Sequence, residues 1–78
     1  MTKAGLIAKL KTAYRGAAKG EKAVTVHLFG VKYADDLSEQ GALAEIVRDA
    51  GLPLTYQTEV KKGMNLSRFV DVKRNVKL

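Results

Sequence analysis

A helical repeat of apolar residues near the start of the chain constrains its fold more than any other sequence feature. Within residues 3–18, apolar side chains recur at every third or fourth position, the spacing of one helix face. These are Leu6, Ile7, Leu10, Tyr14 and Ala17. Lys11 and Arg15 are four residues apart, about one turn of the same predicted helix, so a basic stripe runs beside its apolar face. The glycines at 16 and 20 predict the helix end and a turn.

The short length and the absence of cysteine limit how this chain can be stabilised. Its 78 residues leave room for one core, and a composition of 46% hydrophobic and 28% charged residues is typical of a globular protein. Without cysteine, neither disulfides nor thiolate metal sites can support the fold, so packing or self-association must do so. We expect one domain over residues 1–78, in which residues 71–78 could form a flexible basic tail.

The net charge of +6 is unevenly distributed along the chain. Residues 1–32 and 61–78 are basic, whereas residues 33–60 are acidic. If the two basic ends meet in space, they form one positive face of the kind that binds phosphates. A solvated surface that only keeps the protein soluble is an equally good interpretation of the same charges.

Residues 22–37 fit two kinds of secondary structure. β-Branched residues from Val24 to Val31 favour a strand, but the spacing of the apolar residues also fits a helix face. We favour a helix broken near Gly30, because a strand here could pair only with a second strand around Phe69–Val72. If those two segments do pair, the fold becomes α+β with a small two-stranded element.

A second helical region contains a candidate helix-turn-helix unit. Residues 41–50 predict a short helix that Gly51 closes, and Pro53 soon afterwards is a typical stop signal. A new helix can begin at residue 54 or 55, with Thr55 as its N-cap, and continue to Gly63. Helix, three-residue turn with a glycine, helix is the arrangement of a helix-turn-helix unit.

Residues 27–37 and 44–73, with the separation between them, resemble a family of short prokaryotic helix-turn-helix-like proteins. The similarity covers roughly residues 20–73. It implies an all-α bundle of about four to five short helices and a DNA-binding role, but it brings no established activity or ligand.

The local match to the helix-turn-helix pattern is partial. Val47 stands where a small residue usually permits close approach of the helices, and Gln57 stands where an apolar residue is usual. The residues expected to pack the two helices together are Ile46, Ala50, Leu52 and Val60.

If the unit binds DNA, its second helix supplies the surface that faces the groove. Threonine and glutamine can pair with base edges there, and lysine is better suited to backbone phosphates. Basic residues elsewhere would add sequence-independent attraction. The candidates are Thr55, Gln57, Thr58, Lys61 and Lys62 on that helix, Arg68, Lys73 and Arg74 after it, and Lys11 and Arg15 on the first helix. For each of Gln57 and Thr58, an ordinary position on a solvated helix face is a commoner role than a contact with DNA.

No catalytic or metal-binding pattern is visible. His27 is the only histidine, so it has no histidine partner for a metal site, and a structural role is the better interpretation. The segment Gly-Glu-Lys at residues 20–22 lacks the other residues of a phosphate-binding loop. We expect no enzyme activity and no cofactor. Lysines interrupt the apolar residues at the N-terminus, which excludes a signal peptide and a spanning segment there, so we expect a cytoplasmic protein without membrane contact.

Two functions remain after these exclusions. The first is a transcriptional regulator or accessory factor that binds double-stranded DNA, expected to act as a homodimer because pairing doubles a small interface. The second is a protein-interaction module, such as an antitoxin-like partner subunit, whose acidic middle and basic ends contact another protein.

Overall fold

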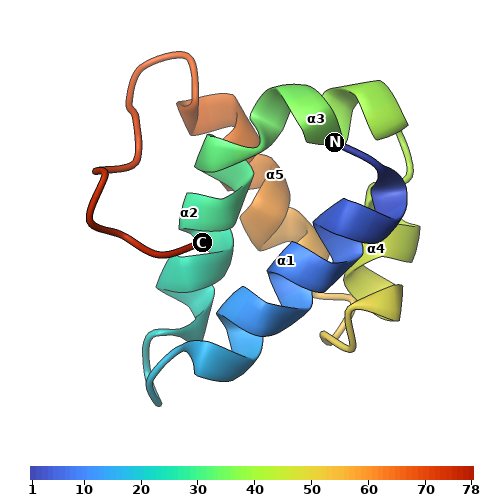
Figure 1. The fold of residues 1–78 in the computed structure, drawn as a ribbon, viewed down its shortest axis with the longest axis horizontal. Helices are drawn as coiled ribbons and strands as arrows, with labels where there is room; N and C mark the ends of the chain where they lie inside the picture. Colours follow the sequence, from blue (N-terminus) through green and yellow to red (C-terminus); the bar gives the residue numbers. More distant parts are fainter.

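A computed structural model describes residues 1–78 as five helices without a strand (Figure 1). The helices are α1 (Lys3–Gly16), α2 (Lys22–Lys32), α3 (Ala34–Gln40), α4 (Leu43–Asp49) and α5 (Tyr56–Leu66). The all-α prediction is confirmed. The α+β alternative is wrong, because residues 22–32 are helical and Phe69–Val72 continues from α5 as a turn and irregular chain.

Side-chain hydrogen bonds are present at both ends of α1. The Thr2 hydroxyl accepts a hydrogen bond from the Gly5 amide and so caps the start of α1. At the other end, the Lys22 ammonium donates to the carbonyl oxygens of Tyr14 and Ala17, at 2.7 and 3.3 Å. A cation there is favoured by the partial negative charge of the carbonyl end of a helix. Lys22, the first residue of α2, therefore ties the start of that helix to the end of α1.

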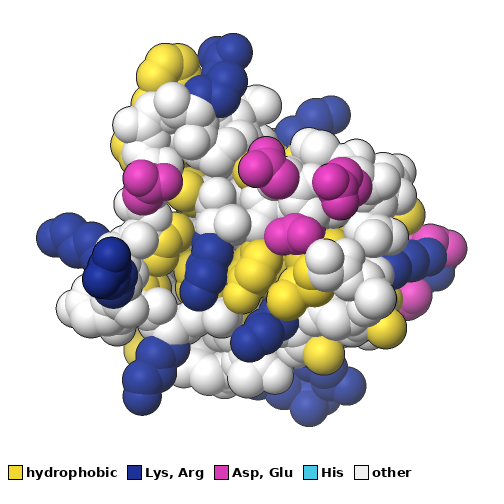
Figure 2. Space-filling view, turned by 45° about the horizontal axis from the view of Figure 1, so that its top comes forward, with side chains coloured by type: hydrophobic (Ala, Val, Ile, Leu, Met, Phe, Trp, Pro, Cys, Tyr) yellow, Lys and Arg dark blue, Asp and Glu magenta, His cyan; other side chains and the backbone are white.

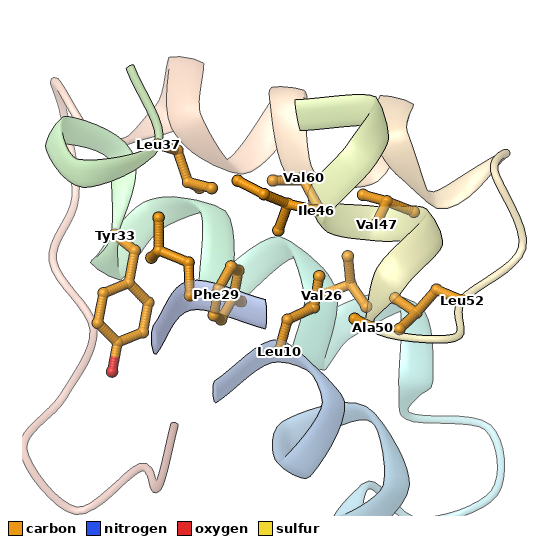
Figure 3. Close-up of a cluster of buried hydrophobic side chains, with 11 residues drawn as sticks. Leu10, Val26, Phe29, Tyr33, Leu37, Ile46, Val47, Ala50, Leu52 and Val60 are labelled. Atoms are coloured by element: carbon orange, nitrogen blue, oxygen red, sulfur yellow. The ribbon is translucent and has the colours of Figure 1, made fainter. Parts of the chain in front are cut away.

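The core lies where α1, α2, α4 and α5 converge (Figure 3). Phe29 of α2 is fully buried among them, and its ring lies 4.8 Å from that of Tyr33. The other fully buried large side chains are Leu6, Leu10, Val26, Ile46, Val47 and Val60. The repeat found in residues 3–18 thus supplies two core residues from α1. No polar or charged side chain is buried.

The helices α2 and α5 cross at two glycines, and theirs is the most extensive contact between any two helices. A Cβ atom added to Gly30 would overlap the Val60 carbonyl oxygen, and one added to Gly63 would overlap the His27 carbonyl oxygen. The break predicted near Gly30 lies three residues later, at Tyr33. The helix runs through Gly30 and ends at Lys32, because that glycine provides close backbone approach and not a bend.

The predicted helix-turn-helix unit consists of α4, residues 50–55 and α5, so its turn is longer than the three residues expected. Gly51 follows α4 in the left-handed conformation, with φ of 86°, as the sequence indicates. The extra length arises after Pro53, where hydrogen bonds to the carbonyls of Pro53 and Leu54 form a tight turn before α5. Thr55 occupies the N-cap position, but its side chain makes no capping hydrogen bond.

We expect Gly51→Ala to lower the free energy of unfolding by about 1 kcal/mol, because a side chain with positive φ is strained. No atom lies within 4 Å of an added Cβ there, so the backbone conformation alone is tested. Urea denaturation would measure the loss. Gly51→Asn is the matched control, since asparagine tolerates this conformation better, and an alanine variant as stable as the parent would contradict the prediction.

The last residues, 67–78, contain no helix but pack along α2 (Figure 1). The Tyr33 hydroxyl donates a hydrogen bond to the Leu78 carbonyl oxygen at 3.1 Å. Lys77 and Leu78 also line a groove with Gly5, Ala8 and other residues of α1. The two basic ends of the sequence therefore do meet, between α1 and the tail.

Candidate nucleic-acid interface

The exposed face of α5 is polar and basic. Thr58, Lys61, Lys62 and Asn65 are all exposed, and their spacing of three and four residues places them on one side of the helix. Val60 and Gly63 on the opposite side are buried against the rest of the protein. The face carries amide and hydroxyl groups that can pair with base edges, beside two ammonium groups.

The only acidic residue of α5 is paired within the protein. The Glu59 carboxylate lies 2.9 Å from His27 Nε2 on α2 and 3.8 Å from the Lys62 ammonium. The Gly30–Gly63 crossing brings these residues together, because it draws the backbone of α5 against that of α2 at His27. The Glu59 carboxylate would therefore repel a bound phosphate less than an unpaired carboxylate would.

At the start of α5, the predicted residues differ in accessibility. Thr55 and Thr58 are exposed, but Gln57 is partly buried. Tyr56 packs edge-on against Tyr14 of α1, with ring centroids 5.4 Å apart. Desolvation, followed by the nearby Tyr14 hydroxyl, raises the pKa of Tyr56 above its ordinary value.

The predicted basic residues after α5 lie on two different sides of α2. Arg68 is exposed directly after α5 and lines a hollow with residues of that helix. Lys73 and Arg74 instead line a hollow with Lys32, which lies on the side of α2 away from Gly30 and α5. The two hollows share no residue, so Lys73 and Arg74 do not form one patch with Arg68 and the α5 face.

The predicted basic stripe of α1 is exposed at both Lys11 and Arg15. These residues flank Tyr14, whose ring contacts Tyr56 at the beginning of α5. In Figure 1, α1 lies in front and α5 behind. The stripe thus borders the start of α5 and does not extend its exposed face.

Acidic side chains gather over α3 on the face shown in Figure 2. Asp35 and Asp36 lie in the first turn of α3, where carboxylates favour the helix dipole. Asp36 also accepts a hydrogen bond from the Met1 amino group at 2.9 Å, which raises the pKa of that amine. The Lys3 ammonium and the Glu45 carboxylate form a further ion pair nearby. A polyanion would be repelled from this side.

Sequence reasoning missed two features of this face. Asn65 has the i+7 spacing from Thr58 that marks one helix face, a signal that could have been found once the helix was extended to Leu66. The pairing of His27 with Glu59 depends on the crossing of α2 and α5, and no local pattern indicates it.

A family model described as an HTH-like domain matches residues 2–73 of the chain. Neither curated proteins nor solved structures gave a match. None of the five helices has the length and apolar character needed to cross a bilayer.

Proposed function

The chain belongs to the HTH-like domain family, and from that premise we propose that it is a small module that binds double-stranded DNA. The observation that carries the proposal is the exposed face of α5, where Thr58, Lys61, Lys62 and Asn65 lie together without a free carboxylate. The second helix of a helix-turn-helix unit is the one that enters the major groove. Here α5 holds that position after α4 and its turn.

Each residue of this face has a role that follows from its chemistry. Lys61 and Lys62 would contact phosphates and release counterions, which gives affinity without sequence preference. The Asn65 amide can donate to and accept from one adenine, and the Thr58 hydroxyl can pair with several bases. Arg68 at the end of α5 would add a phosphate contact, as would Lys11 and Arg15 beside its start. Lys73 and Arg74 line a different hollow from Arg68, so they would serve only long-range attraction.

A titration of a labelled mixed-sequence duplex by fluorescence anisotropy tests the proposal. Across roughly 50 to 200 mM salt, a protein with several phosphate contacts loses orders of magnitude in affinity, so we expect a steep fall. A shallow slope, or no binding at low salt, would contradict the proposal. The mass of the saturated complex would show whether two copies bind together, as the small size of a single interface favours.

The acidic surface over α3 favours a second candidate function, contact with another protein. Charged surfaces of opposite sign steer protein partners together and fix their orientation. In that case a stoichiometric partner should co-purify from the native host and stay bound after nuclease treatment. Release by nuclease would instead support the nucleic-acid function.

A further inference from the structure

A hollow of about 420 Å³ lies at the C-terminal end of α5, next to the proposed DNA-binding face. Its lining residues come from α2, α5 and the turn that follows: His27, Lys62, Asn65, Leu66, Arg68 and Phe69. Most of them carry hydrogen-bond donors or positive charge, and the remaining two are apolar. This lining is more polar than that of a hydrophobic groove that binds an amphipathic helix.

Phe69 is the most exposed large apolar side chain of the protein, at 74%. The backbone that carries it is held in a turn, because the Phe69 amide donates to the Leu66 carbonyl at 2.9 Å and the Val70 amide donates to the same oxygen. The Ser67 hydroxyl also donates to the Met64 carbonyl and closes the turn. The ring lies 5.1 Å from the Arg68 guanidinium carbon, a cation–π arrangement. An aromatic ring that is exposed in this way offers a stacking surface.

The polar groups around the ring suit the other parts of a nucleotide. Lys62 and Arg68 supply cations for a phosphate, and the Asn65 amide can pair with a base edge. Aromatic stacking beside a positively charged groove is how proteins bind unpaired nucleotides. Bases within a duplex are stacked on their neighbours, so the ring can serve only a nucleotide that has left the stack.

We propose that this hollow binds one unpaired DNA nucleotide beside the duplex, with its base stacked on Phe69 and its phosphate held by Lys62 and Arg68. The inference rests on the proposed function, since it assumes that α5 has placed the duplex alongside. It extends that function from duplex binding to recognition of a distorted or unpaired position.

Two duplexes test the inference, one fully paired and one with a single unpaired 2-aminopurine in its middle. We expect the wild-type protein to bind the second about tenfold more tightly, the effect of stacking one base, and to change the 2-aminopurine fluorescence. Phe69→Ala and Phe69→Leu should lose both the preference and the fluorescence change, whereas Phe69→Trp keeps them. Val70→Ala is the matched control, because that side chain is exposed but does not line the hollow.

The outcomes separate this inference from the proposed function. Binding to the paired duplex without preference for the unpaired one overturns the inference alone, as does a preference that survives Phe69→Ala. Tight binding only to the unpaired duplex, lost in Phe69→Ala, supports nucleotide binding in the hollow but overturns duplex binding by α5, and with it the placement of the duplex that the inference assumes. Binding to neither overturns both. Circular dichroism of each variant confirms that helical content is retained.

Discussion

Gly63→Ala is expected to lower the free energy of unfolding by at least about 3 kcal/mol. An added Cβ atom would overlap the backbone oxygen of His27, and no rotation of a side chain can relieve that clash. The two helices would have to separate along the most extensive helix–helix interface in the protein. Because single domains are stable by only about 5–15 kcal/mol, such a loss would remove a large fraction of the stability of the fold. Gly30→Ala should act in the same way.

Urea denaturation followed by circular dichroism would measure this effect, and Gly16→Ala is its matched control. Gly16 also lies in a helix, but nothing is within 4 Å of an added Cβ. Alanine is the better helix former, so that variant should gain up to about 0.5–1 kcal/mol. The same glycine-to-alanine substitution is thus expected to lower the free energy of unfolding at Gly63 and to raise it at Gly16. A stability gain in Gly63→Ala would show that α2 and α5 do not cross at these residues.

Lys61→Glu combined with Lys62→Glu should weaken duplex binding by about a hundredfold at moderate salt, because it replaces two phosphate contacts with repulsion. The slope of log affinity against log salt should also become shallower, by about 0.9 for each phosphate that the variant no longer neutralises. Anisotropy titrations of wild-type and variant protein over the same salt range would measure both. Replacing both lysines with glutamine should give a smaller decrease of the same kind, without adding negative charge beside Glu59.

A second double reversal, Lys9→Glu with Lys77→Glu, makes the same change in net charge at a different place. Both residues line the groove between α1 and the tail, away from the face of α5. We expect this variant to lose much less affinity than the first. Equal decreases in the two variants would mean that binding follows net charge and not the face of α5.

Several elements could be predicted from the sequence because their signals are local. The helical repeat of residues 3–18 led to α1, and Gly51 marked the end of α4, since apolar spacing and glycine at a positive φ depend on neighbouring residues alone. The residues expected to pack the helix-turn-helix unit, such as Ile46 and Val60, are buried. The candidate basic residues were also exposed, as charged side chains usually are.

Other features depended on the packing of distant segments against each other. Gly30 could be taken for a helix break because propensity disfavours glycine inside a helix, and only its close approach to Gly63 explains its place there. The sequence also could not predict which basic residues share a surface. Arg68 and Arg74 are close in sequence, but they line different hollows, Arg68 with residues of α5 and Arg74 with Lys32 of α2.

The sequence by itself determined the helical class, most of the helix positions and the family, because these follow from short-range spacing and pattern. Only the tertiary structure decided which residues share a surface: it placed Asn65 with Lys61, paired His27 with Glu59 and left Phe69 exposed beside them. The physical reason is the crossing of α2 and α5. The close backbone approach of Gly30 and Gly63, which are distant in sequence, sets the relative position of the helices, and no local preference specifies it.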